Sequence, residues 1–249
     1  MDMHTALTRH RKAKGTDVMK SYVKLKELPY SKKIRRWVTE RYGDSAEKVW
    51  KEVCRNYYSY QKDMPDYGGR KNGHFRAIYG GLLVFAWYAA LPDHPPIEEL
   101  QGFVQDMFMG SFTTLGKVFD LNRPTDMRII DTVFRRSGDR DRKDAEKYPD
   151  GFINVDHPYD SRHRAASYKF TQCPNAKFAK KHDMLHVLPL MCNCDYFGIS
   201  QIHGLLVRHG TCGNASVCDY LIIGDKSPIA ARYETLTDDK GFLITRHKK

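Results

Sequence analysis

Residues 168–220 read YKFTQCPNAKFAKKHDMLHVLPLMCNCDYFGISQIHGLLVRHGTCGNASVCDY. Five of the six cysteines fall in this stretch, whereas the first hundred residues contain only Cys54. Aspartates stand close to three of the five, in CNCD at 192–195 and in CD at 218–219. A concentration of thiols and carboxylates of this kind indicates a site rather than a core.

Short apolar runs separated by turn residues surround these cysteines and predict strands and short helices. We expect helices over 174–182 and 185–202, the second bent or interrupted at Pro189 and Gly198. We expect strands over 152–155, 166–171, 205–208, 217–223 and 242–245. The C-terminal part is therefore predicted to be a small, mostly antiparallel sheet with two helices.

Helical periodicity dominates the chain before residue 137 and predicts helices over 31–38, 45–58, 74–91, 98–119 and 126–136. The segment 74–91 is apolar on most sides, so we expect it at the centre of the fold. Residues 137–150, SGDRDRKDAEKYPD, have almost nothing to bury and predict a charged break.

These patterns predict an α+β fold in which a helical N-terminal part packs on the C-terminal part. We expect a flexible basic tail at 1–18, a helical part at 19–137, a charged connector at 138–151 and an α+β part at 152–249. The last part should carry the cysteines and aspartates, within one integrated catalytic domain.

The formal net charge is +11, and residues 1–60 hold 15 Lys/Arg against 7 Asp/Glu. The basic character therefore belongs to the N-terminal part and not to the cysteine-rich part. Nucleic acid or an anionic membrane could bind such a surface. No RNA- or DNA-reading motif accompanies the charge, so we favour a solvated helical face and expect no nucleic-acid partner.

The first 20 residues are polar and predict no secretory signal. The apolar run at 77–91 is about 15 residues long, shorter than the roughly 20 that span a bilayer, so we expect no membrane partner. Six cysteines without a signal indicate a reducing compartment. We therefore expect a cytoplasmic protein with free thiols, and we keep a homo-oligomer open.

Cys173 directly precedes Pro174, a residue that suits the first position of a helix. The positive end of the helix dipole and the free backbone N–H groups would lower the pKa of a thiol placed there. This makes Cys173 the best nucleophile candidate, beside the plainer interpretation of a small residue that ends a strand.

Cys192 and Asp195 stand three residues apart and would share one face of a helix. Because a neighbouring carboxylate raises a thiol pKa, Asp195 suits a base for water or an acceptor for a substrate N–H. Cys218 and Asp219 alternate on a strand, so they face opposite sides. Arg208 could pair with an aspartate or bind a substrate carboxylate with its two-pronged guanidinium.

Metal binding has weaker support. Neither Cys192-x-Cys194 nor the pair formed by Cys212 and Cys218 has the spacing of a zinc knuckle. We expect no cofactor and keep zinc as the alternative, in a metal- or redox-sensing module.

The run Thr171-x-Cys173-Pro174, Cys192-x-x-Asp195-Tyr196, Arg208-x-x-Thr211 and Cys218-Asp219-Tyr220 resembles the L-2-amino-thiazoline-4-carboxylic acid hydrolase family. The similarity covers mainly residues 152–225, with a less specific match from about 73 to 119. Cys194 and Cys212 look like additions to the family pattern.

The resemblance implies a hydrolase that opens a C–N bond of a cyclic amidine carboxylate towards a carbamoyl-cysteine. Its matching positions make Cys173, Cys192, Asp195, Cys218 and Asp219 the catalytic candidates. Arg208, Thr211 and His74 are the candidates for binding a small-molecule carboxylate substrate. A thiolate such as Cys173 could attack the amidine carbon, or an aspartate could activate water; we place the covalent route slightly ahead. Another cyclic amide or amidine is the alternative substrate.

Overall fold

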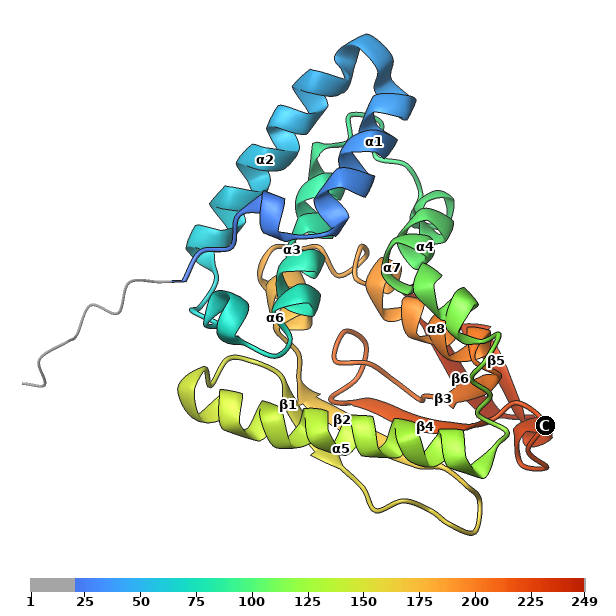
Figure 1. Ribbon diagram of the computed structural model, residues 1–249. Coiled ribbons are helices and arrows are strands. Elements are labelled where there is room, and N and C mark those ends of the chain that lie inside the picture. The colour runs from blue at the N-terminus through green and yellow to red at the C-terminus, as the bar shows by residue number, and fades with distance from the viewer. Residues whose placement is uncertain (1–20, 249) are drawn as a thin grey trace, which may run out of the picture.

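The computed structural model describes residues 21–248, so the expected tail at 1–18 lies outside the described residues. Figure 1 shows the first two helices at one end of the molecule and the main sheet at the other, with α5 lying along the sheet. The helices of the first half are α1 (Tyr30–Tyr42), α2 (Ala46–Asp63), α3 (Phe75–Ala90), α4 (Ile97–Leu115) and α5 (Pro124–Lys147).

Helix α3 is the central helix, as its apolar composition predicts. Eleven of its residues are buried, and Trp87 is fully enclosed. The ring of Trp37 from α1 meets the Trp87 ring edge-on, with 4.8 Å between the centroids. Gly81 lets α6 (Pro174–Lys181) approach, because a Cβ there would lie 2.7 Å from Nδ2 of Asn175. That amide donates to the carbonyl oxygen of Ala77 at 3.1 Å.

The main sheet has four antiparallel strands in the order β1 (Ile153–Asp156), β2 (Ala166–Gln172), β4 (Cys218–Gly224) and β3 (Gly204–Val207). Tyr168 on β2 pairs with Tyr220 on β4, and their rings stack with 4.4 Å between the centroids. Cross-strand aromatic pairs of this kind fix the register of a sheet.

A separate hairpin consists of β5 (Tyr233–Thr237) and β6 (Leu243–His247). The sequence predicts β6 but not β5, whose residues are partly exposed and mostly polar. The backbone N–H of Thr245 donates to the carbonyl oxygen of Arg208 at 2.7 Å, which ties the hairpin to the end of β3.

The predicted charged connector is wrong as local structure, because the chain is helical through Lys147. Ion pairs hold this half of α5: Arg135 to Asp131 at 2.8 Å, and Arg142 to Asp139 and Asp156 at 2.5 and 2.8 Å. Pairs three or four residues apart stabilise a solvated helix without apolar side chains. Hydrophobic periodicity does not predict this half of the helix, because its buried residues are Gly138 and Asp141 rather than an apolar stripe.

The segment expected to be one helix over 185–202 is divided into α7 (Pro189–Cys192) and α8 (Cys194–Gln201). Asn193 lies between them and binds the hairpin, donating to the carbonyl oxygen of Gly241 and accepting from the N–H of Leu243. One apolar core extends through the helices and the main sheet, from Val23 to Phe242. The predicted α+β fold is confirmed. None of the helices between residues 21 and 248 combines the length and the hydropathy that a membrane span requires.

Candidate active site

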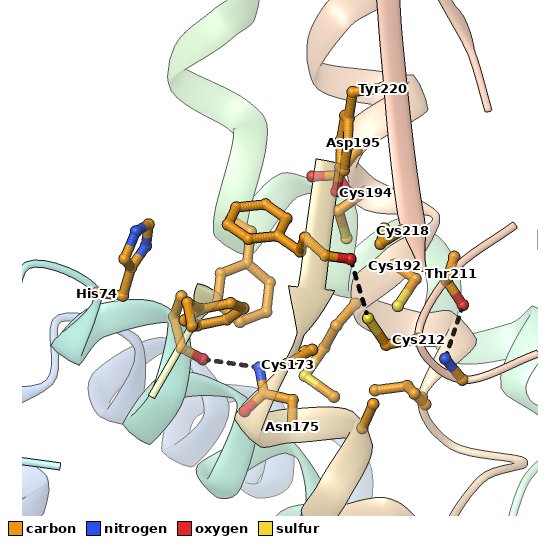
Figure 2. Close-up of a pocket in the computed structure, with 18 of the residues that line it drawn as sticks. His74, Cys173, Asn175, Cys192, Cys194, Asp195, Thr211, Cys212, Cys218 and Tyr220 are labelled. Carbon is orange, nitrogen blue, oxygen red and sulfur yellow. Dashed lines mark hydrogen bonds between the residues drawn. The ribbon is translucent and has the colours of Figure 1, made fainter. Parts of the chain in front are cut away.

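A cavity of about 240 Å³ lies where α3, α4 and the α6–α8 segment meet the inner face of the sheet. Figure 2 shows labelled side chains from the α6–α8 segment, the loop after β3 and the strand β4 around it, with His74 at the left of the view. Its wall is formed by His74, Ala77, Phe108, Met109, Phe152, Tyr168, Phe170, Cys173, Asn175, Ala176, Leu188, Met191, Cys192, Cys194, Asp195, Thr211, Cys212, Gly213, Cys218 and Tyr220. The structure therefore brings all five cysteines of the 168–220 stretch to one cavity.

Local structure explains how each side chain reaches the wall. Cys173 is the last extended residue before α6, and Cys192 ends α7. Asp195 lies in the first turn of α8, where the helix dipole favours an acidic side chain. Cys218 and Tyr220 are two residues apart on β4, so both side chains lie on its inner face.

Asp195 is held by two donors, one from Arg208, directly after β3, and one from Tyr220 on β4. Its Oδ2 accepts from Nη1 of Arg208 at 2.9 Å and from the hydroxyl of Tyr220 at 2.6 Å. Oδ1 forms no hydrogen bond within the described residues. The side chain retains 28% of its exposed area, and this area faces the cavity because Asp195 lines its wall. One carboxylate oxygen is therefore free to meet a ligand.

Burial raises the pKa of Asp195, although the positive charge of Arg208 and the hydrogen bonds from Tyr220 and Arg208 act in the opposite direction. A carboxylate with a raised pKa is a better proton acceptor than an ordinary aspartate. The positive charge of Arg208 still favours the ionised form of the Asp195 carboxyl group.

The predicted lowering of the Cys173 thiol pKa is wrong in direction. Burial raises that pKa to about 12, and the N–H groups of Ala176 and Asn175 at the helix start compensate only in part. Burial also raises the pKa of Cys192 and brings that of Cys218 to about 12. These thiols are therefore neutral near pH 7.

Cys194 and Cys212 also line the cavity but are engaged with the backbone. The Cys194 thiol donates to the carbonyl oxygen of Leu190 at 3.0 Å, and that of Cys212 to the carbonyl oxygen of Phe170 at 3.5 Å. Both side chains are buried, so these two thiols help to shape the cavity wall.

Arg208 does not face the cavity. Its side chain is fully buried, and its Nη2 donates to the carbonyl oxygen of Cys192 at 2.8 Å. The Cζ atom of its guanidinium lies 4.8 Å from the ring centroid of Tyr196 and 5.6 Å from that of Tyr220. Of the two roles predicted for Arg208, the structure shows pairing with an aspartate. Both Nη atoms of its guanidinium are already hydrogen-bonded, so they are not available to a substrate carboxylate.

Asp219 lies on the outer side of β4, away from the cavity wall. It accepts from Nδ1 of His209 at 2.7 Å and from the backbone N–H groups of His209 and Gly210. Those hydrogen bonds lower its pKa against the effect of burial. Asp219 therefore caps a turn and is not brought together with the other candidates.

Thr211 and His74 both line the cavity. The Thr211 hydroxyl donates to Oδ1 of Asn214 at 3.0 Å and accepts from the N–H of Gly213 at 3.1 Å, so it is occupied in shaping the turn. His74 lies at the start of α3, with Nε2 2.6 Å from Oδ1 of the buried Asp141.

Sequence reasoning missed Tyr220 and Asp141. The alternation along β4 could have placed Tyr220 beside Cys218, because residues two apart on a strand share a face. Asp141 had no such signal, since its segment was predicted to be a charged break.

Zinc was the alternative cofactor. Within residues 21–248, no three His, Cys, Asp or Glu side chains are arranged to hold a metal ion. All six cysteines are free.

Comparison with known proteins agrees with the sequence resemblance. A family model described as L-2-amino-thiazoline-4-carboxylic acid hydrolase matches residues 76–221. The matched range begins within α3 and ends in β4, so it includes every cysteine and aspartate candidate. Searches of curated proteins and of solved structures found no match.

Proposed function

This chain belongs to the L-2-amino-thiazoline-4-carboxylic acid hydrolase family, hydrolases acting on the C–N bond of a cyclic amidine, and from that premise we propose that its cavity opens the ring of 2-amino-thiazoline-4-carboxylate. Other cyclic amidines or amides of similar size are the alternative substrates.

The observation that carries the proposal is the free Oδ1 of Asp195. An amidine presents N–H donors around the carbon to be attacked, and a carboxylate is their natural acceptor. Asp195 is the one carboxylate among the described residues that line the cavity. Arg208 and Tyr220 fix its orientation through Oδ2, which leaves Oδ1 for the substrate or for water.

We favour direct attack by water over the covalent thiol route. The thiols of Cys173, Cys192 and Cys218 have raised pKa values, and a thiol attacks only as the thiolate. The negative charge of Asp195 disfavours a thiolate nearby. Asp195 is therefore better suited to activate water than to stand beside a nucleophilic thiolate.

In the water route, Asp195 takes a proton from water while the water oxygen bonds to C2 of the ring. The C2–N double bond becomes single, and C2 becomes tetrahedral. The proton held by Asp195 passes to the ring nitrogen, which has gained the electron pair of the former double bond. Asp195 then takes the proton of the new hydroxyl group as the carbonyl forms, and this second proton reaches the ring nitrogen as its bond to C2 breaks. One water is consumed, and a carbamoyl group remains on sulfur.

The product tests this proposal. Breaking C2–N releases a primary amine and keeps sulfur carbamoylated, whereas breaking C2–S would release a thiol. We expect the purified protein to convert 2-amino-thiazoline-4-carboxylate to a product that reacts with an amine reagent but not with a thiol reagent. An unchanged substrate, or a product with a free thiol, would contradict ring opening at C–N.

A further inference from the structure

The charges in the cavity wall are few. Among the described residues that line it there is no lysine or arginine, and the guanidinium of Arg208 is enclosed behind Asp195. The wall therefore contains one carboxylate, that of Asp195, and one imidazole, that of His74. A substrate with an amidine at one end and a carboxylate at the other needs a partner for each end.

His74 is fixed by its neighbours. Its ring packs against the ring of Phe152 with 4.8 Å between the centroids, and its backbone N–H donates to Oδ1 of Asn72 at 2.7 Å. The side chain keeps 23% of its exposed area, part of which faces the cavity it lines. Figure 2 places His74 on the opposite side of the view from Asp195 and Tyr220.

Asp141 explains why His74 is suited to an anion. It lies on the buried side of α5 with 1% of its side chain exposed, and its Oδ1 is 2.6 Å from Nε2 of His74. Neither carboxylate oxygen has a well-aligned hydrogen bond within residues 21–248. A buried carboxylate without compensation is unfavourable, and an orphan of this kind at a cavity calls for a functional explanation.

A second histidine–aspartate pair, His163 and Asp160, differs from the pair of His74 and Asp141 in its exposure to solvent. Nδ1 of His163 lies 2.6 Å from Oδ2 of Asp160, the same separation as in the first pair, but their side chains are 43% and 45% exposed. Water can compensate Asp160, whereas Asp141 depends on the imidazole. Nε2 of His74 faces Asp141 and also lies 3.5 Å from the hydroxyl oxygen of Ser137, which leaves Nδ1 as the ring nitrogen for a ligand.

We propose that His74 binds the carboxylate of the substrate, and that Asp141 is the positioning residue that holds the imidazole for it. The amidine end then lies against Asp195 on the other side of the cavity. This assignment rests on the proposed function, and it makes His74 the residue that selects carboxylate-bearing rings over rings without that group.

Binding can test this without turnover. The probes are thiazolidine-4-carboxylate and thiazolidine, titrated calorimetrically into the full-length protein and into its His74→Gln and Asp141→Asn variants. We expect each variant to weaken binding of the carboxylate probe about tenfold or more, equivalent to about 1.4 kcal/mol. Binding of thiazolidine should stay unchanged. His163→Gln, which removes the solvated histidine, is the matched control and should alter neither.

Two results would overturn the assignment: equal affinity of wild type and His74→Gln for the carboxylate probe, or equal losses for both probes. Asp141→Asn keeps the shape of the side chain, so it provides a second reading if His74→Gln unfolds.

Kinetics separate this proposal from the proposed function. With 2-amino-thiazoline-4-carboxylate, His74→Gln should raise KM with a small effect on kcat, and its preference for this substrate over 2-amino-thiazoline should fall about tenfold or more. His163→Gln should keep the wild-type preference. Wild-type protein that binds the carboxylate probe through His74 but hydrolyses neither ring would refute the hydrolase mechanism and leave the binding assignment standing. Wild-type turnover with unchanged selectivity in His74→Gln would refute the assignment alone.

Discussion

At the scale of single residues, burial decides the chemistry of the cavity. The thiol of Cys173 stands at a helix start, which alone would favour the thiolate, yet burial raises its pKa to about 12. Position along the chain predicts the dipole effect, but it does not reveal how many other side chains close around the sulfur. The sequence could therefore identify the candidate and could not give the sign of its pKa shift.

The pH dependence of activity should follow Asp195. As a base it must be ionised, and its pKa is raised above the usual value. We expect kcat/KM to fall as the pH decreases, with a midpoint above the ordinary aspartate value of about 3.9. Tyr220→Phe removes a hydrogen bond that lowers this pKa, so the midpoint should move to higher pH. A pH–rate profile in which the variant's midpoint is unchanged or lower would argue against Asp195 as the base.

At the scale of elements, the contact between α3 and α6 determines where Cys173 lies. Residues 98 apart in the chain meet when Nδ2 of Asn175 reaches the carbonyl oxygen of Ala77. The sequence predicted both helices, α3 from a segment that is apolar on most sides and α6 from a short apolar run that begins with Pro174. It could not predict α5 beyond residue 136, where ion pairs replace apolar burial, nor the polar strand β5.

Gly81→Ala should disturb that contact, since the new Cβ would collide with the Asn175 amide. Gly102→Ala is the matched control, because nothing lies within 4 Å of a Cβ there and alanine favours an exposed helix by up to about 1 kcal/mol. We expect Gly102→Ala to have a higher melting temperature than wild type. Gly81→Ala should have a lower melting temperature than wild type and a reduced turnover number. Equal melting temperatures would mean that the contact contributes nothing to stability.

At the scale of the whole molecule, one apolar core joins the helices to the sheet, and the cavity lies between them. The sequence predicted this α+β arrangement because both parts have apolar faces that need a partner. It could not say which side chains would meet inside, so Asp219 was grouped with Asp195, although Asp195 on α8 lines the cavity and Asp219 on β4 does not. Adjacency in sequence does not give adjacency in space on a strand.

The buried thiols should make the folded protein sensitive to alkaline pH. In the unfolded chain cysteines ionise near pH 8.5, whereas Cys173 and Cys218 keep their protons to about pH 12 in the folded protein. The unfolded state therefore loses protons first, and the free energy of unfolding should decrease between about pH 8.5 and 12. Urea denaturation at pH 8 and pH 10.5 measures this, and Cys218→Ala should reduce the slope. An equal free energy of unfolding at both pH values would contradict it.

The role of Asp195 as the base is tested most directly by the turnover number of Asp195→Asn on 2-amino-thiazoline-4-carboxylate, compared with those of Cys173→Ala, Cys192→Ala and Cys218→Ala. Asp219→Asn serves as the matched carboxylate outside the cavity. Because a general base contributes about 10²–10⁴-fold, we expect Asp195→Asn to lose that much kcat, while each cysteine variant and Asp219→Asn remain within about tenfold of wild type. A folded Asp195→Asn variant with wild-type kcat, or a folded cysteine variant that is inactive, would contradict the mechanism.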